Sequence, residues 1–262
     1  MNQNYDFLKT SMRLQHDIMF DQLVELDSTI IGFSHLDPSP CWNLALVNQP
    51  IDNQHLHDVE KVLNQAHRDS TIYYQNRPDL DKLTQQLTSH NYHLEFTDAW
   101  KCWPGSETDQ EFFNQVKKVE SENQLDDFIQ AFDLSFQAND PQNPFGAAGA
   151  SLDVARKNWH KHHQSGRIEY FIVYDQDTPA AISALTNFQG IGYIYYVGSV
   201  QDFRGEGYGK TATLYAVSKS IQNGNQTHCL TTEANSHPDE FYQHIGFETK
   251  FTALGYTKKL NH

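Results

Sequence analysis

The chain has 262 residues, a length that favours about two domains, and its hydrophobic content of 38% is enough to fill two packed cores. The formal net charge of −14 disfavours nonspecific binding to nucleic acid, which needs Lys and Arg to neutralise phosphates, and is compatible with a cationic substrate such as an amine. With no apolar run near about 18 residues and no CxxC pair, we expect a cytoplasmic chain without membrane or nucleic-acid partners.

The first half alternates segments of helical and strand character. Apolar residues at loosely helical spacing predict helices over Tyr5–Val24 and residues 56–66, and Asp79 is placed to cap a third helix. Runs of β-branched and aromatic residues predict strands over Thr29–Phe33, Trp42–Val47, Thr71–Tyr74 and Tyr92–Trp103. This alternation indicates an α/β or α+β layered domain.

The loop after the second predicted strand, Asn48–Asn53, contains no glycine. Backbone that approaches a phosphate closely, or adopts a positive φ, is normally glycine. We therefore expect no phosphate site in the first half. The polar breaker cluster Pro104–Asp109 is the predicted linker, and it divides the chain into domains of residues 1–108 and 109–262.

The second half opens with a predicted strand, Val116–Val119, and a capping box, Ser121–Gln124, that starts a helix. The loop Asn139–Gly149 is expected near the substrate entrance, and a short helix follows it. Hairpin-length connections make the next three strands antiparallel: Ile168–Tyr174, Ala180–Phe188 and Ile191–Val200. Beyond a helix over residues 211–221, we expect a parallel strand at His228–Thr232, a helix at Asp239–Ile245, and strands at Phe247–Phe251 and Leu254–Leu260.

The stretch Gly192–Gly209, GYIYYVGSVQDFRGEGYG, predicts a strand, a glycine loop and the start of a helix. This layout points backbone N–H groups and a helix N-terminus at an anion. The tripeptide Gly209-Lys210-Thr211 matches the end of a GxxxxGK[ST] nucleotide loop, but the first glycine of that motif would fall at Arg204. The preceding strands are also linked by hairpins rather than by βαβ units, which disfavours a nucleotide hydrolase.

Four ordered features resemble the GCN5-related N-acetyltransferase (GNAT) superfamily. They are the hairpin-linked strands, R-x-x-G-x-G from Arg204 to Gly209, Asn235, and Y-x-x-x-G-F starting at Tyr242. The resemblance covers residues 113–260, and the first half resembles a degenerate copy of the same fold. The implied fold is α/β (α+β layered): a mixed, mostly antiparallel twisted sheet flanked by helices, in two tandem GNAT-like domains.

The resemblance implies transfer of an acetyl group from acetyl-CoA, as co-substrate, to a primary amine of a small molecule or peptide by direct attack, without a metal. Tyr242 would protonate the departing thiolate, a backbone N–H near Val197 would stabilise the oxyanion, and Asn235 would bind the pantetheine arm. The implied CoA-binding residues are Val197, Ser199, Val200, Arg204, Gly205, Gly207, Tyr208, Gly209, Lys210 and Asn235.

Several assignments stay open from the sequence. The base that deprotonates the amine is either Glu233 or ordered water lined by Tyr193, Tyr195 and Tyr196. The histidines of Trp159–His163 suggest a metal, but zinc needs three or four converging ligands, so a surface helix is expected instead. The alternatives are a catalytically inactive acyl-CoA-binding regulatory module and an enzyme that uses a larger acyl group. The acceptor and the oligomeric state are not readable.

Overall fold

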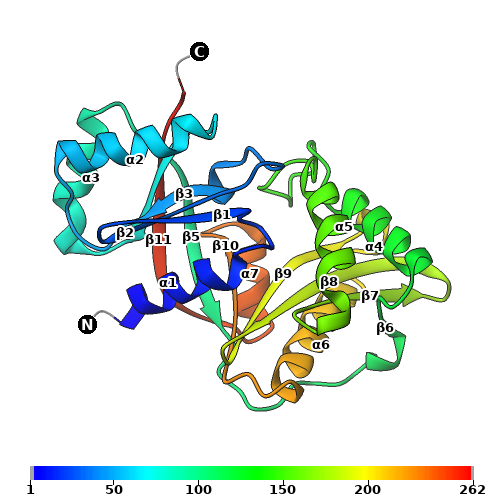
Figure 1. The fold of residues 1–262 in the computed structure, drawn as a ribbon. Helices are drawn as coiled ribbons and strands as arrows, with labels where there is room; N and C mark the ends of the chain where they lie inside the picture. The colour runs from blue at the N-terminus through cyan, green and yellow to red at the C-terminus, as the bar shows by residue number, and fades with distance from the viewer. Residues whose placement is uncertain (1–2, 261–262) are drawn as a thin grey trace. The chain divides into compact units, whose positions relative to one another are not determined.

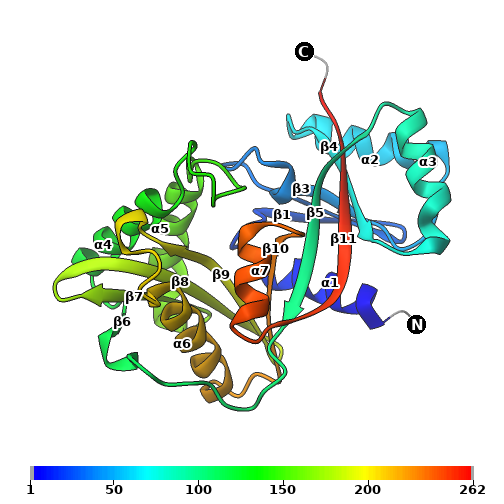
Figure 2. The ribbon, with the colours of Figure 1, turned by 180° about the vertical axis from the view of Figure 1, so that it is seen from behind.

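The computed structural model describes residues 3–260 and divides into two compact units. The first unit holds the chain up to Ala99 and again from Phe251, and the second holds Trp100–Lys250. The chain passes from one unit to the other within β5 (His93–Cys102) and returns within β11 (Glu248–Lys258) (Figures 1 and 2). The units therefore differ in detail from the predicted residues 1–108 and 109–262, because the last strand returns to the first unit.

In the described part of the first unit, the strands form a sheet in the order β1-β2-β3-β4-β11-β5. Strand β11 pairs antiparallel with β4, from Ala253↔Gln75 to Lys258↔Ser70. The elements before β5 are α1 (Gln3–Gln15), β1 (Gln22–Leu26), β2 (Thr29–Phe33), β3 (Asn43–Leu46), α2 (Asn53–Gln65), β4 (Ser70–Gln75) and α3 (Asp81–Ser89).

Two predictions for this unit were wrong. The first helix ends at Gln15, and the chain then forms β1, which pairs with β2 through a tight turn where Asp27 has φ 50°. Backbone pairing with β2 outweighs the loose helical spacing of these residues. Asp79 caps no helix: it pairs with Arg77 at 3.0 Å, and α3 begins after a 3-10 turn at Pro78–Leu80.

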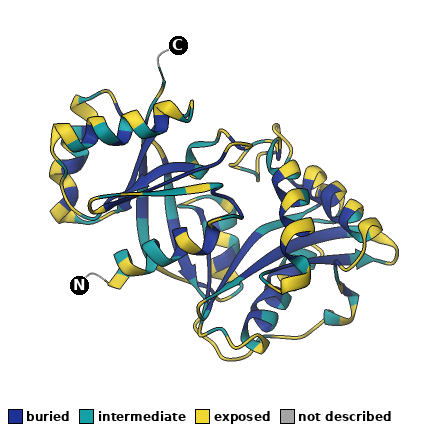
Figure 3. Ribbon diagram, in the orientation of Figure 1, coloured by how far each residue is buried: buried dark blue, intermediate teal, exposed yellow. Residues whose placement is uncertain are grey.

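The core of the first unit lies between its sheet and the helices α2 and α3. The predicted stripe of α2 is buried, with Leu56, Val59 and Leu63 at 0–1% exposure. Leu83 and Leu87 of α3 belong to the same cluster. Figure 3 shows the corresponding pattern, in which β2, β3 and β4 are buried and the helices keep exposed outer faces.

The second unit has strands in the order β10-β9-β8-β7-β6. Strands β7, β8 and β9 are antiparallel and β10 is parallel to β9, as predicted. The elements are β6 (Val116–Lys118), α4 (Glu122–Ser135), α5 (Ser151–His162), β7 (Ile168–Asp175), β8 (Thr178–Phe188), β9 (Ile191–Ser199), α6 (Tyr208–Gln222), β10 (Thr227–Glu233) and α7 (His237–His244).

The predicted N-cap of α4 at Ser121 is confirmed, while the returning bond of the capping box goes to the residue before the N-cap. The Ser121 hydroxyl accepts a hydrogen bond from the Gln124 N–H at 3.4 Å, and the Gln124 side chain accepts one from the Glu120 N–H at 2.8 Å. The prediction of two final strands was wrong: β11 runs without interruption through Thr252 and Ala253. Backbone pairing with β4 begins at the predicted break, where the Asn76 N–H donates to the Thr252 carbonyl and Ala253 pairs with Gln75, and it keeps the chain extended there.

The two units repeat one order of elements. Three antiparallel strands, a helix and a strand parallel to the third occur as β1-β2-β3-α2-β4 and as β7-β8-β9-α6-β10. This confirms the predicted mixed, mostly antiparallel sheets with flanking helices in both halves. Within residues 3–260, none of the helices is long and apolar enough to cross a bilayer.

Candidate active site

Strands β9 and β10 separate soon after they begin. Their parallel register, over the described residues, is Ile191↔Thr227, Gly192↔His228 and Tyr193↔Cys229, and it extends no further. Both strands continue beyond these pairs, β9 to Ser199 and β10 to Glu233. The two strands therefore splay apart, which leaves backbone of both strands outside a shared ladder.

A β-bulge lies where β9 runs beside this gap. The register with β8 steps from Ala184↔Tyr195 to Ile182↔Gly198, so Tyr196 and Val197 stand opposite Ser183 alone. Tyr196 has φ 50°, an uncommon conformation for a residue with a large side chain. Bulges redirect the backbone next to functional sites, and this one falls at the position predicted to hold the thioester carbonyl.

The glycine loop ends at the N-terminus of α6, which lacks a side-chain cap. Gly207 is the N-cap residue with φ 87°, and Gly205 has φ 84°. Open space surrounds the position of a Cβ at either residue, so the positive φ is what requires glycine. Thr211 N–H bonds to the Gly207 carbonyl, while the first three N–H groups of the helix, from Tyr208 to Lys210, have no intrahelical acceptor. An anion would satisfy these donors and complement the helix dipole.

The equivalent helix start in the first unit is closed to an anion. There, the N-cap of α2 is Asp52, whose carboxylate accepts the His55 N–H at 2.8 Å. A phosphate at that position would be repelled by the Asp52 carboxylate, which already accepts one N–H of the first turn. The lack of glycine in Asn48–Asn53 and the capped start of α2 both disfavour a phosphate site in the first unit.

The last glycine of the motif, Gly209, is required for a different physical reason. A Cβ on Gly209 would lie 2.6 Å from the Ser199 hydroxyl oxygen, so glycine allows the first turn of α6 to approach the end of β9. At the next residue, the Val200 N–H donates to Ala180 and the Val200 carbonyl accepts from Phe203. Val200 therefore shapes the turn into the loop, and its N–H is committed to the protein.

The charged side chains of the motif bond to the protein in this structure. Arg204 forms a bidentate ion pair with Asp140, whose side chain is 4% exposed. Lys210 pairs with Asp109 at 3.1 Å, and both side chains are about half exposed. The hydrogen bond from the Glu111 N–H and then the contact with Lys210 lower the pKa of Asp109. Sequence reasoning placed these two cations at the phosphates and missed both carboxylate partners.

Tyr242 lies on α7 and is 7% exposed. Its ring contacts the rings of Phe241 and Phe247. It belongs to the cluster that contains Ile194, against which Val197 also packs. Burial raises the pKa of its phenol well above the usual value. A protonated phenol in the cluster against which Val197 packs is suited to donate a proton.

Asn235 follows β10 in a left-handed conformation, with φ 60°. Its N–H donates to the Asp239 carboxylate at 2.8 Å, and the Lys101 ammonium lies 2.5 Å from the same carboxylate. Lys101 is fully buried and also donates to Thr249. Sequence reasoning missed Lys101 and Asp239; the only available signal was an acidic residue at the third position of a helix whose N-cap is Ser236.

The candidates for the general base lie on the two separating strands. Glu233 is the last residue of β10 and is half-buried, and its carbonyl accepts the Ser236 hydroxyl. On β9, the Tyr193 hydroxyl bonds to Thr231 of β10 at 2.7 Å, and the Tyr195 ring lies between those of Tyr193 and Tyr196. The structure thus brings the predicted base candidates to β9 and β10.

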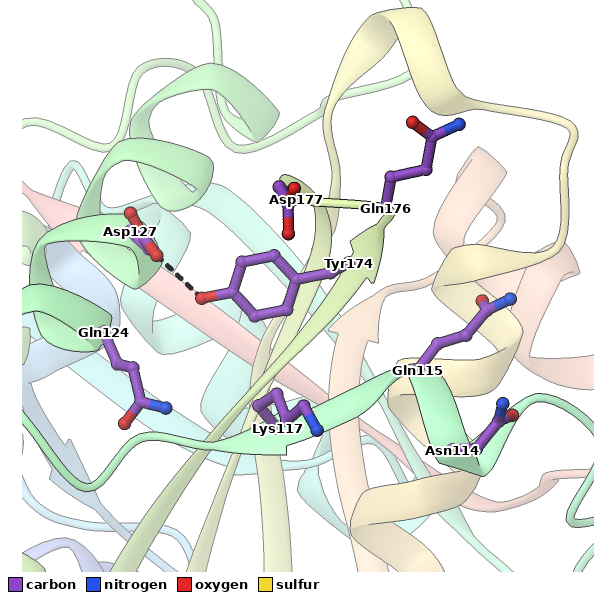
Figure 4. A pocket seen from close by; sticks show the side chains of 8 residues that line it. All are labelled: Asn114, Gln115, Lys117, Gln124, Asp127, Tyr174, Gln176 and Asp177. Carbon is purple, nitrogen blue, oxygen red and sulfur yellow. Dashed lines mark hydrogen bonds between the residues drawn. The ribbon is translucent and has the colours of Figure 1, made fainter.

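Two other polar clusters do not include these residues. His163 stacks on Trp159 at 3.8 Å, and the described part of the chain contains no group of three metal-ligating side chains. Figure 4 shows a polar hollow in the second unit, where the Tyr174 hydroxyl donates to Asp127 at 2.7 Å. None of the predicted CoA-binding residues lines this hollow. The residues that line it are Asn114, Gln115, Lys117, Gln124, Asp127, Tyr174, Gln176 and Asp177.

A mixed sheet whose central strands separate beside a glycine-capped helix defines the GNAT fold. The family model described as FR47-like protein matches residues 172–256, which include β8, β9, the glycine loop and α7. No curated protein matches the chain. The resemblance predicted from the sequence is confirmed, and the chain has the GNAT fold.

Solved structures agree with this fold over nearly the whole chain. A GCN5-related N-acetyltransferase from Kribbella flavida is 18% identical with a TM-score of 0.68, covering 97% of this chain and 96% of the other. A conserved protein of unknown function from Staphylococcus epidermidis is 14% identical with a TM-score of 0.68, covering 93% and 96%. A tandem GNAT protein from the clavulanic acid biosynthesis pathway is 9% identical with a TM-score of 0.52, covering 89% and 79%.

Proposed function

We propose that this protein transfers an acetyl group from acetyl-CoA to a primary amine of a small molecule or peptide. One observation carries the proposal: β9 and β10 separate after three residue pairs, directly before a loop that ends in an uncapped helix N-terminus. The gap suits an extended pantetheine arm that bonds to strand backbone. The helix start suits the pyrophosphate at the other end of that arm.

The backbone is the main ligand in this proposal. The N–H groups between Gly205 and Lys210 bind the pyrophosphate, and the left-handed conformations at Gly205 and Gly207 direct them toward it. Ser199 and Val200 shape the entry to the loop, and Asn235 binds the pantetheine arm or a bridging water. The helix dipole of α6 adds a favourable potential at low ionic strength.

In the chemical step, the neutral amine attacks the thioester carbonyl, forming a C–N bond and a tetrahedral oxyanion. A backbone N–H at the Val197 bulge stabilises this charge, and loss of one such donor typically costs about 3 kcal/mol of barrier. The C–S bond then breaks, and Tyr242 gives its proton to the CoA thiolate. The proton that the attacking nitrogen loses as it becomes the amide returns through water to the Tyr242 phenolate, so the phenol is restored. Because burial keeps the pKa of Tyr242 high, the phenol holds its proton at neutral pH.

The amine must lose a proton before it attacks, since the pKa of an alkylammonium is about 10.4. Glu233 is the proposed base, either directly or through water near the tyrosines of β9. Its position at the end of β10 supports this role, because β10 borders the gap that we propose for the thioester. The proton it accepts leaves with solvent after the product amide departs.

The test is acetyl-CoA thioester cleavage measured against a panel of amines, peptides and lysine-bearing proteins, together with CoA affinity by calorimetry. For Tyr242→Phe we expect turnover to fall by about 10- to 1000-fold with CoA affinity within twofold, because only the acid is removed. Tyr174→Phe, which changes a hydroxyl in the separate polar hollow, is the matched control. CoA binding without turnover on any amine would refute the enzyme and leave an acyl-CoA-binding module; turnover unchanged in Tyr242→Phe would refute the acid role.

A further inference from the structure

Arg204 occupies the first position of the glycine motif, but its guanidinium is fully used by the protein. Two of its bonds go to the carboxylate of Asp140, at 2.8 Å for the Nη1 contact. The other three go to the Ser199 carbonyl (3.3 Å), the Ser135 carbonyl (3.4 Å) and the Gln142 side chain (3.3 Å). A guanidinium has five N–H donors, and here each donor has an acceptor.

The acceptors come from three separate segments of the second unit. Ser199 ends β9, Ser135 ends α4, and Asp140 lies in the loop of residues 136–150 between α4 and α5, which we name the α4–α5 loop. The C-terminal end of a helix carries partial negative charge, so the Ser135 carbonyl favours a cation at this position. Arg204 thus links the glycine loop, the end of β9 and the α4–α5 loop.

The α4–α5 loop is organised around Asp140. The Asp140 carboxylate accepts the Gln142 N–H, and the Asp140 carbonyl accepts the Asn143 N–H, each at 3.0 Å. The Asn143 side chain then bonds to the Gly146 carbonyl and accepts the Phe145 N–H. Bonding to Arg204 is the main cause that lowers the pKa of Asp140. The loop otherwise exposes its apolar tip, where Phe145 is 55% exposed.

We infer that Arg204 is a positioning residue: through Asp140 it holds the α4–α5 loop against the donor site, and it does not bind the pyrophosphate with its side chain. The inference rests on the proposed function only for its effect on catalysis, which assumes that the loop borders the amine acceptor. Loss of the pair releases the loop, so the acceptor KM rises while CoA affinity changes little. If the Arg204 side chain instead bound the pyrophosphate, its loss would weaken CoA affinity and leave the acceptor KM little changed.

The test compares Arg204→Lys and Asp140→Asn with wild type. Lysine keeps the charge but cannot form the bidentate pair, and asparagine keeps the shape of aspartate but loses the charge. Hydrogen exchange of peptides from residues 136–150 is measured without ligand, and CoA affinity is measured by calorimetry at two salt concentrations. We expect at least tenfold faster exchange in both variants and a CoA Kd within threefold of wild type. Lys210→Met, in the same motif, is the control that leaves exchange of this loop unchanged.

The outcomes separate the two claims. Unchanged exchange in Arg204→Lys, or a CoA Kd weakened tenfold or more with the salt dependence reduced, would overturn the positioning role. Failure of the wild type to bind CoA would refute the proposed function, while the exchange result for the unliganded loop would still stand. Circular dichroism of each variant checks that the chain is folded. If Arg204→Lys folds poorly, hydrogen exchange of the loop in Asp140→Asn tests the same ion pair.

Discussion

Replacing Lys101 with Met should destabilise α7 and the turn before it. The ammonium is fully buried and lies 2.5 Å from the Asp239 carboxylate, which is itself 8% exposed. At this separation and an effective dielectric constant of about 20, the attraction is about 7 kcal/mol before desolvation is counted. Breaking a buried pair by removing one partner costs about 3–5 kcal/mol, because the other charge stays buried alone.

We expect a loss near the lower limit, about 3 kcal/mol, because Asp239 keeps two other sources of stabilisation. It still accepts the Asn235 N–H, and it lies in the first turn of α7, where the helix dipole favours a negative charge. Asp239→Asn and the double variant Lys101→Met/Asp239→Asn complete a cycle. The double variant should be less destabilised than the sum of the single variants, since it leaves no unpaired charge.

Urea unfolding measures the total loss, and native-state hydrogen exchange of the α7 amides shows whether the loss is local. The free energy of opening of α7 should fall by the same amount as the free energy of unfolding, or by more. A change below about 0.5 kcal/mol in Lys101→Met, or additive losses in the double variant, would refute the buried ion pair as the anchor of α7.

Two further predictions concern the glycine loop and the buried phenols. Gly207→Ala and Gly224→Ala, at φ 87° and 81°, should each lose about 1 kcal/mol of stability from left-handed strain, but only Gly207→Ala should weaken CoA binding, by about tenfold or more in calorimetry. Equal effects on affinity would contradict the loop's role. Burial raises the pKa of Tyr195 to about 12 from about 10 in the unfolded chain, so the folded state binds this proton more tightly. Stability should therefore be complete below about pH 10 and fall between about pH 10 and 12, by up to about 1.4 kcal/mol per pH unit for this phenol. Urea unfolding with a tyrosinate absorbance titration measures this fall, and constant stability to about pH 12 would contradict it.

The sequence predicted the parts of the site that local chemistry determines. Alternating β-branched and aromatic residues with hairpin-length connections identified β7, β8 and β9, and glycines identified the loop because only glycine adopts its positive φ without cost. The N-cap at Ser121 is a local signal too, and it was correct.

Features that depend on distant partners were not predictable in this way. Lys101 and Asp239 meet only after β5 and α7 come together, and neither residue type indicates burial by itself. Arg204 resembled a phosphate ligand until Asp140, from a loop without readable pattern, was found beside it. The bulge falls at Tyr196 and Val197, neither of which is a glycine, and the single strand β11 depends on pairing with β4.

The most direct test of the proposed donor site is a crystal structure of the protein with acetyl-CoA or CoA. We predict one bound molecule, with its pyrophosphate on the N–H groups between Gly205 and Lys210 and its pantetheine arm between β9 and β10. The Arg204 side chain should remain on Asp140 in the complex. A CoA bound at the Asp52-capped start of α2, or one whose phosphates avoid the α6 N-terminus, would contradict the account.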